Sequence, residues 1–256
     1  MVYLKTHNEI DLMRKSSQLV ARTHSELAKV IKPGITSLYL DKLAEEFIRD
    51  NGGVPAFKGY NGFPNTLCVS KDEEVVHGIP SNKEMSEGSI LSIDCGVLMN
   101  GFYGDSAYTF PVGKISKEKE RLLDITKEAL DRGVLAATCG NTIGDIGYVI
   151  QSFAESHGYS VVRELVGHGI GKKLHESPEV PNYGKKGEGV LIEEGMVLAI
   201  EPMVNVGVSD VIQKADGWTI ITKDGLPSAH FEYTIAIRKH ETEILSPFHL
   251  IEESLN

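Results

Sequence analysis

The sequence predicts an α+β protein of 256 residues built from two similar halves, roughly 1–112 and 113–256. Two amphipathic helical patterns open each half, and apolar or alternating segments typical of strands follow each pair of helices. Two short motifs also occur once in each half, in the same order. We therefore expect a single domain over 1–256, with a curved, mostly antiparallel sheet and helices on its outer face.

The first half is predicted to begin with two helices. Thr6 and Glu9 have the spacing of a capping box, and apolar residues then recur at helical intervals until Pro33 and Gly34. A second amphipathic run ends at residues 51–53, where Asn-Gly-Gly breaks the pattern. Each run carries an apolar stripe that has to pack against another element.

The second half repeats this arrangement. Ser116 opens a charged amphipathic helix, and Gly140 and Asn141 end it. A further run with helical spacing ends near Gly158. Each pair of helices leads into segments with strand character, so the two halves have the same order of elements.

The predicted strands of the two halves also match each other. Glu73–Ile79 aligns with Glu164–Ile170, and the two segments share Glu, Val, His, Gly and Ile. Downstream, Glu87–Asp94 aligns with Glu194–Glu201, so an acidic residue ends both strands at the same register. The alternative, two independent domains, would leave these acids facing solvent for no reason, and we favour one domain.

Residues 90–110 alternate in the manner of a β-hairpin whose turn is Asn100-Gly101, the strongest short-range signal for a two-residue turn. With that turn, Asp94 and Asp105 share one face as diagonal neighbours, with α-carbons about 7 to 8 Å apart. Two carboxylates so close do not both stay ionised without a cation. A register slip of one residue would turn one of them outward.

Two further acids follow in the second half. Glu201 ends an apolar strand and is the counterpart of Asp94 in the duplication. The duplication does not place Glu232, although alternation puts it on one face of its strand together with His230 and Thr234.

His168 lies in the glycine-rich run 167–171, and His175 follows seven residues later. A lone histidine in a strand is more often a core or surface residue than a metal ligand. The glycines on both sides favour the ligand, because they indicate that the backbone approaches something closely. The run lacks the spacing of a phosphate-binding loop, so nucleotide binding is not expected.

Four carboxylates and one imidazole carry a formal charge that two divalent cations neutralise. Oxygen-rich sites with one nitrogen suit Mn, Fe or Co better than a closed structural zinc site, which prefers thiolates and imidazoles. Two such ions can bridge a water and present it as hydroxide to a carbonyl carbon. The residues therefore predict metal-assisted amide hydrolysis.

Composition limits the other functions. The net charge is −10, which disfavours a phosphate-binding surface and makes nucleic acid a poor candidate substrate. Residues 1–10 have no apolar leader and no stretch reaches the length of a membrane span, so a cytoplasmic protein is expected. Cys68, Cys95 and Cys139 show no metal-binding spacing, and each is interpreted as a buried, reduced thiol.

The acids and the histidine stand in familiar surroundings: S-I-D-C-G-V, G-D-S-A, G-H-G-I-G, I-E-P-M and F-E-Y-T, with V-V-H-G-I-P around His77. In this order the chain resembles the methionine aminopeptidase family, whose fold is called the pita-bread fold. The resemblance covers nearly the whole chain. It points to the minimal type I form, because only 31 residues separate Glu201 from Glu232 and no N-terminal cysteine-rich zinc module is present.

The resemblance implies a set of roles. It implies that two divalent ions (Co, Mn or Fe) are held by five ligands, Asp94, Asp105, His168, Glu201 and Glu232, with Asp94 on one ion, Asp105 and Glu232 bridging both, and His168 and Glu201 completing the other site. Glu201 would also move the proton from the bridging water to the departing amine. His175 would hydrogen-bond the peptide carbonyl and its developing oxyanion, and His77 the amide nitrogen beside the leaving group.

The implied reaction is removal of the initiator methionine from nascent polypeptides, preferentially when the second residue is small. We expect a monomer that acts in the cytoplasm, near the ribosome. By the same resemblance the methionine pocket is lined by Tyr60, Phe63, Cys68 and Trp218. The sequence departs from common family residues at Phe57 and Leu174, which leaves the pocket shape open.

Two rival readings stay open. Proline-directed relatives, aminopeptidase P and prolidase, normally carry a large extra N-terminal domain, whereas the first helix predicted here starts within the first ten residues. Metal-free binding modules with the same fold usually lose ligands, whereas all five are present here. The sequence does not decide the physiological metal, the oligomeric state or the presence of a monovalent cation site.

Overall fold

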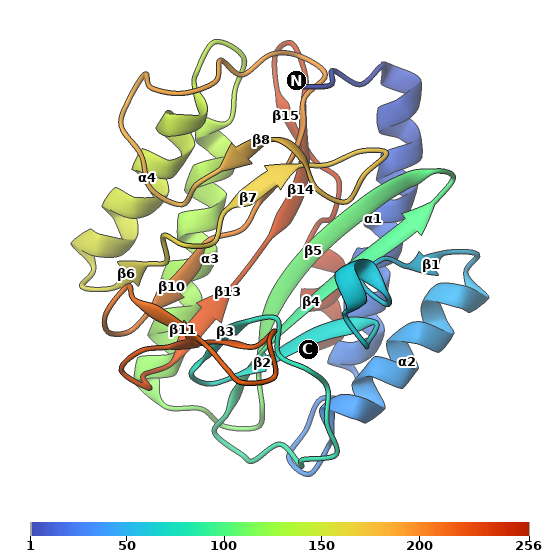
Figure 1. Cartoon of the computed structure of the whole chain (residues 1–256), viewed down its shortest axis with the longest axis vertical. Helices are drawn as coiled ribbons and strands as arrows, with labels where there is room; N and C mark the ends of the chain where they lie inside the picture. Colours follow the sequence, from blue (N-terminus) through green and yellow to red (C-terminus); the bar gives the residue numbers. More distant parts are fainter. Residues whose placement is uncertain (1, 256) are drawn as a thin grey trace.

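The computed structural model describes residues 2–255 (Figure 1). The described helices are α1 (His7–Ala28), α2 (Ser37–Asp50), the 3-10 turn η1 (Tyr60–Gly62), α3 (Lys117–Ala136), α4 (Ile143–Ser156) and α5 (His249–Leu255). The strands are β1 (Val54–Pro55), β2 (Leu67–Lys71), β3 (Glu74–Val76), β4 (Ile90–Met99), β5 (Phe102–Pro111), β6 (Ser160–Val161), β7 (Gly167–Gly169), β8 (Glu176–Val180), β9 (Val197–Ile200), β10 (Met203–Asn205), β11 (Val211–Gln213), β12 (Ile220–Thr222), β13 (Ser228–His230), β14 (Tyr233–Ile237) and β15 (Thr242–Ile244).

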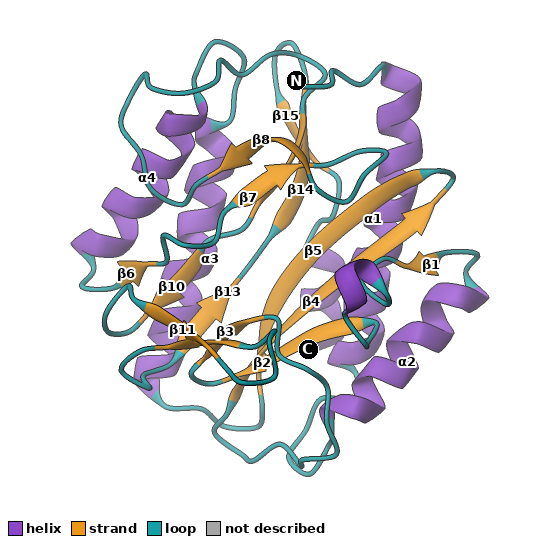
Figure 2. Cartoon of the chain, viewed as in Figure 1, coloured by secondary structure: helices purple, strands orange, loops and turns teal. Residues whose placement is uncertain are grey.

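The four long helices lie where the sequence predicts them. Thr6 caps α1 through a complete capping box with Glu9, and the Ser116 hydroxyl accepts a hydrogen bond at the start of α3. Figure 2 shows α1 and α2 at one side of the strands, and α3 and α4 at the other. The short helix α5, which the periodicity analysis did not predict, packs against α1.

The β4–β5 hairpin has the predicted register. Asn100 and Gly101 both adopt positive φ values, 54° and 78°, as a type I′ turn requires. Asp94 pairs with Ala107, and the facing residue numbers add to 201 along the whole ladder. The two aspartates therefore lie on one face of the hairpin, as predicted.

The remaining ligand candidates belong to a second sheet with the strand order β15-β14-β9-β7-β8. His168 is the central residue of β7, Glu201 directly follows β9, and Glu232 directly precedes β14. Every strand pair among residues 2–255 is antiparallel, in agreement with the predicted mixture of helices and antiparallel strands.

The first sheet meets the second where β5 lies beside β14, and it meets a third sheet, β13-β10-β6, where β5 lies beside β13. Neither contact among residues 2–255 is a regular backbone ladder. One backbone bond, from the Glu232 amide to the Ala107 carbonyl, measures 2.9 Å. Elsewhere hydroxyl groups bridge the strands: the Thr234 hydroxyl donates to the Asp105 carbonyl at 2.7 Å, and the Ser106 hydroxyl donates to the Glu232 carbonyl at 2.7 Å. The curved sheet expected from the sequence is thus completed by side chains at its centre.

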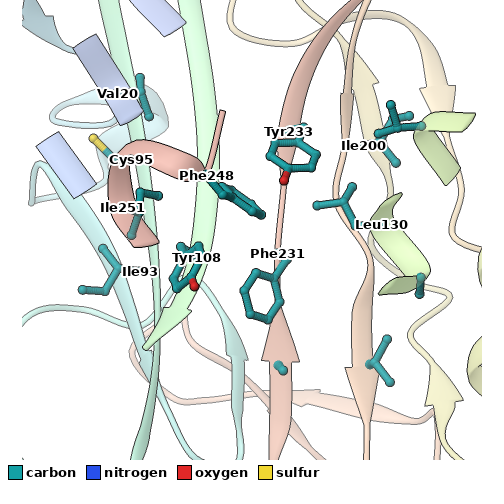
Figure 3. Close-up of a cluster of buried hydrophobic side chains, with 14 of the residues drawn as sticks. Val20, Ile93, Cys95, Tyr108, Leu130, Ile200, Phe231, Tyr233, Phe248 and Ile251 are labelled. Atoms are coloured by element: carbon teal, nitrogen blue, oxygen red, sulfur yellow. The ribbon is translucent and has the colours of Figure 1, made fainter. Parts of the chain in front are cut away.

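Aromatic rings fill the core beneath this junction (Figure 3). Tyr108 of β5 contacts Phe231 and Phe248 edge-on, with ring centroids 5.0 and 4.9 Å apart. Tyr233 stacks on Phe248 at 4.0 Å. Such ring pairs add to the free energy that burial of apolar area already supplies, so they fix β5 and β14 side by side.

The other predictions about the chain have mixed outcomes. Cys68 and Cys95 are buried free thiols as expected, but Cys139 is exposed, because it lies in the loop after α3. Among residues 2–255, no helix is both long and apolar enough to cross a membrane. A single domain with halves at 1–112 and 113–256 stays a proposal.

Candidate metal centre

The residues predicted for the site come together around one cavity of about 350 Å³. Its lining includes the five predicted ligands, both predicted catalytic histidines and all four predicted pocket residues: Asp94, Asp105, His168, Glu201, Glu232, His77, His175, Tyr60, Phe63, Cys68 and Trp218. These residues come from both sheets, from η1 and the residue after it, and from the loops that follow β3, precede β8 and precede β12. The cavity therefore forms only when the strands of the two sheets lie side by side.

The β-strand register places the acidic residues. Asp94 and Asp105 are diagonal neighbours on the β4–β5 hairpin, and the Glu232 amide bond to Ala107 brings the third carboxylate next to them. Ligand atoms of Asp105, His168 and Glu232 all lie within 4.8 Å of one another, and all three residues are buried.

The orientation of the His168 ring leaves one nitrogen facing the acids. Nδ1 lies 2.9 Å from the Gly169 carbonyl oxygen, so it carries the proton and donates it. Nε2 is then free to accept, and it lies 3.7 Å from Glu201 Oε1 and 4.0 Å from Asp105 Oδ2. This arrangement is typical of metal-binding histidines, whose second nitrogen is held by a carbonyl or carboxylate.

Gly167 and Gly169, on either side of His168, are required because neighbouring strands leave no space for a Cβ atom. A Cβ on Gly167 would lie 2.4 Å from the Ala199 carbonyl oxygen of β9, and a Cβ on Gly169 would lie 2.4 Å from the Ser177 carbonyl oxygen of β8. The close approach predicted from these glycines is therefore confirmed, and the groups that approach are the neighbouring strands.

The carboxyl groups are too crowded and too buried to be ionised together. Burial raises the pKa of Asp94 to about 7 and the pKa of Glu201 to about 8. Burial, followed by repulsion from the neighbouring carboxylates, holds the pKa values of Asp105 and Glu232 well above their usual range.

The same groups fit divalent cations. Three carboxylate oxygens, Asp94 Oδ1, Asp105 Oδ1 and Glu232 Oε1, are buried without a hydrogen-bond partner among the described residues. Buried polar atoms in folded proteins are almost always paired, and buried charges are paired or coordinate metals. A set of carboxylate oxygens with one imidazole nitrogen is a donor set that suits Mn, Fe or Co.

The two histidines predicted to face the substrate border the same cavity. His77 has a positive φ of 58°, which costs a non-glycine residue about 1–2 kcal/mol and is frequent at functional sites. Burial lowers the pKa of His77 to about 4 and also lowers the pKa of His175. Both rings are therefore neutral at neutral pH, and each can donate one hydrogen bond.

His230, which was not among the residues predicted for the site, also lines this cavity. Its side chain is buried, and Nε2 lies 3.6 Å from Glu201 Oε2 without a hydrogen-bond partner among residues 2–255. The signal was present in the alternation that puts His230 on the same face as Glu232. Glu201 thus stands between two imidazoles, those of His168 and His230.

An apolar recess adjoins the acids. Phe63 and Trp218 meet edge to face with ring centroids 5.2 Å apart, and Cys68 lies opposite Asp94 in the β2–β4 ladder. Burial and the nearby carboxylates hold the pKa of the Cys68 thiol well above its usual range, so the thiol is neutral. Phe57 and Leu174, the departures noted in the sequence, also line this cavity.

Comparison with known proteins finds relatives over nearly the whole chain. The family model of metallopeptidase family M24 matches residues 11–239. A methionine aminopeptidase of Clostridium perfringens is 51% identical over 246 residues, which cover 96% of this chain and 99% of the relative. The crystal structure of the methionine aminopeptidase from Rickettsia prowazekii is similar with a TM-score of 0.95 and 40% identity, covering 96% of this chain and 100% of the other.

A prolidase from Pyrococcus furiosus is similar in fold alone. Its TM-score is 0.79 at 24% identity, and the match covers 95% of this chain but 65% of the prolidase. The fold is thus the pita-bread fold that the sequence resemblance implies.

Proposed function

The chain belongs to metallopeptidase family M24 and, within it, to the methionine aminopeptidases, and on that premise we propose that it removes the initiator methionine from newly made polypeptides. One observation carries the proposal: the group of four buried or half-buried carboxyls and His168 lies in the same cavity as a recess lined by Phe63 and Trp218. The acids supply a place for divalent ions beside a recess that suits an apolar side chain.

We propose that two divalent ions, Mn, Fe or Co, bind here. Asp94 would hold one ion, His168 and Glu201 the other, and Asp105 and Glu232 would contact both. Divalent ions held by these residues would offset the repulsion among the four carboxylates and would supply Lewis-acid activation of the peptide carbonyl and of water. The unpartnered oxygens of Asp94, Asp105 and Glu232 support this assignment.

The chain's own residues then orient and protonate the substrate. Glu201 takes the proton of the attacking water and returns it to the departing amine. His175 donates a hydrogen bond to the carbonyl oxygen of the scissile bond, where negative charge develops. His77 hydrogen-bonds the amide nitrogen of that bond, its bare ring nitrogen accepting from the amide N–H. Burial keeps both imidazoles neutral, so each offers one donor and one acceptor without adding positive charge to the site.

The recess favours methionine by shape and polarity. Tyr60, Phe63, Cys68 and Trp218 line a wall next to the acids, and the Cys68 thiol is neutral there. An unbranched thioether side chain fills such an irregular apolar space and makes favourable contacts with aromatic rings. A small second residue is preferred in this proposal. The protein acts as a monomer in the cytoplasm, on chains emerging near the ribosome.

Peptide hydrolysis by metal-stripped protein, with and without added Mn²⁺ or Co²⁺, tests the function. Three peptides are compared: Met-Ala-Ser, Leu-Ala-Ser and Leu-Pro-Ser. We expect metal-dependent release of methionine from the first and little release from the others. Release ahead of proline regardless of the first residue would assign the chain to the proline-directed relatives. No release with any metal would support a binding module instead.

A further inference from the structure

A hydrogen bond joins two residues that the sequence assigns to separate tasks. The Tyr60 hydroxyl oxygen lies 2.8 Å from Nδ1 of His175, and the two ring centroids are 5.3 Å apart. Tyr60 comes from η1 in the first half of the chain, and His175 directly precedes β8 in the second half. Both residues line the cavity, so the bond links the methionine recess to a residue that faces the scissile bond.

The chemistry of the two groups fixes the direction of this bond. A neutral imidazole has one N–H donor and one bare nitrogen acceptor, and its tautomer follows from the bond that one nitrogen makes. A tyrosine hydroxyl keeps its proton at neutral pH, and an imidazole with its ordinary pKa near 6.5 is mostly neutral above that pH. The imidazole nitrogen is the stronger base, and the phenol O–H therefore donates to Nδ1.

We propose that Tyr60 is a positioning residue that holds His175 as the Nε2–H tautomer. With Nδ1 occupied as an acceptor, the single imidazole proton lies on Nε2, which makes His175 a donor to the substrate carbonyl oxygen. The opposite tautomer would present a lone pair to that oxygen and repel it. The catalytic consequence rests on the proposed function, whereas the tautomer rests on the geometry of this chain.

The turn that carries Tyr60 is tight and is held by backbone hydrogen bonds, which fixes the position of the Tyr60 side chain. Gly59, Asn61 and Gly62 all have positive φ values, 86°, 48° and 89°, so η1 reverses the chain tightly. The Gly59 amide donates to the Phe63 carbonyl at 2.8 Å, and the Phe63 amide donates back to the Tyr60 carbonyl at 2.9 Å. Left-handed backbone at the non-glycine Asn61 is strained, and strained residues cluster where a side chain has to be held in place.

The test combines a hydroxyl deletion with a direct measurement of the tautomer. Protein labelled with ¹⁵N-histidine and loaded with diamagnetic Zn²⁺ is studied by long-range ¹H–¹⁵N correlation, and His175→Ala identifies the signals of His175. In the parent we expect the proton on Nε2 and the shift of a hydrogen-bonded, unprotonated nitrogen for Nδ1. In Tyr60→Phe the Nδ1 signal should move towards that of a free imidazole nitrogen.

Kinetics on Met-Ala-Ser supply the second measurement. Tyr60→Phe keeps the aromatic ring in the recess, so we expect KM within about twofold of the parent and kcat lower by about 3- to 10-fold, the value of one hydrogen bond. Tyr103→Phe is the matched control, since it removes a hydroxyl near Tyr60 that is not bonded to His175. It should change neither the His175 signals nor kcat.

Two results would overturn the proposal: a parent His175 protonated on Nδ1, or unchanged His175 signals in Tyr60→Phe, whether or not kcat is lower. In the last case Tyr60 would only line the recess and would not position His175. A failure of the proposed function is distinguishable, because the parent would then release no methionine while its histidine spectrum would still report the tautomer.

Discussion

At the scale of single residues, the site holds buried polar atoms for which the described part of the protein supplies no hydrogen-bond partner. Asp94, Asp105 and Glu232 each keep a buried oxygen that has no partner within the described part of the chain, and the same holds for the nearby Nε2 atom of His230. Unpaired buried polar atoms cost about 1–3 kcal/mol each, so the protein without ions carries a cost at this centre. Ligation of divalent ions removes that cost, and metal binding is thereby coupled to stability.

Replacing Asp105 with Asn should weaken metal binding. The substitution keeps the shape of the side chain but removes a charge from the oxygen cluster that includes His168 and Glu232. We expect at least one ion to be lost at metal concentrations that saturate the parent, as measured by calorimetric titration and by metal analysis after dialysis. Asp50→Asn, at the exposed end of α2, is the control. Unchanged stoichiometry in Asp105→Asn would rule out a shared ligand at this position.

His24 gives a pH dependence that does not involve the metals. It is fully buried in α1, its Nε2 contacts the Ser106 carbonyl at 2.9 Å, and burial lowers its pKa to about 4. The unfolded chain, with a histidine pKa near 6.5, binds the proton first. The free energy of unfolding should therefore fall by up to about 3 kcal/mol as pH drops from above 6.5 to about 4.

Urea unfolding in the presence of a chelator, at several pH values, measures this effect. His24→Gln replaces the imidazole with a neutral donor, so its loss of stability between pH 7 and pH 4 should be smaller than that of the parent. Parallel curves for the two proteins would show that His24 does not contribute.

At the scale of elements, the first hairpin owes its position to a close contact with α1. A Cβ on Gly104 of β5 would lie 2.5 Å from the Ser17 backbone nitrogen and 2.7 Å from the Ser17 α-carbon. The helix therefore lies directly on the strand, with no side chain between them at this point. Because Asp105 is the next residue along the chain, this contact also sets the depth of one ligand.

Gly104→Ala should destabilise the fold by about 1–3 kcal/mol, the usual cost of forcing an extra carbon into a packed interior. Gly101→Ala is the comparison, because no atom lies within 4 Å of the position of its Cβ, and its cost comes only from the positive φ of 78°. Thermal unfolding of both variants should show the larger loss in Gly104→Ala. The opposite order would mean that α1 and β5 separate easily.

Short-range sequence patterns predicted where the elements begin and end. They did not predict which elements lie side by side in the fold. The capping box at Thr6 and the turn at Asn100-Gly101 are short-range patterns, and both are present as predicted. The hairpin register followed from that turn and placed Asp94 beside Asp105. The position of Glu232 did not follow, because it depends on a contact between β5 and β14, which are far apart in the sequence. The short helix α5 is stabilised by tertiary packing, so periodicity alone did not show it.

At the scale of the whole molecule, the two sheets are joined by hydroxyl groups at the point where the ligands meet. The Thr234 hydroxyl accepts from the Asp105 amide at 3.2 Å and donates to the Asp105 carbonyl at 2.7 Å. One side chain thus satisfies both backbone groups of a predicted ligand. No sequence pattern indicates such a bridge, since a buried threonine in a strand is common and its partner is distant in the chain.

Thr234→Val should remove this bridge while keeping the volume of the side chain. The Asp105 amide and carbonyl would lose their partner, so we expect a loss of about 2–4 kcal/mol in unfolding free energy and weaker metal binding. Thr234→Ser keeps the hydroxyl and should retain most of both properties. Equal behaviour of the valine and serine variants, in urea unfolding and metal titration, would contradict the bridge.

The same junction has a consequence for the chain as it is synthesised. Among residues 2–255, β4 is the one strand that pairs with β5, so until residues 228–237 have left the ribosome β5 presents an open edge rich in hydrogen-bonding groups. An uncovered edge of this length is a template for pairing with another chain, and N-terminal parts fold first during synthesis. A truncated product that ends before β13 should therefore aggregate, and the nascent protein depends on its last strands to protect its first ones.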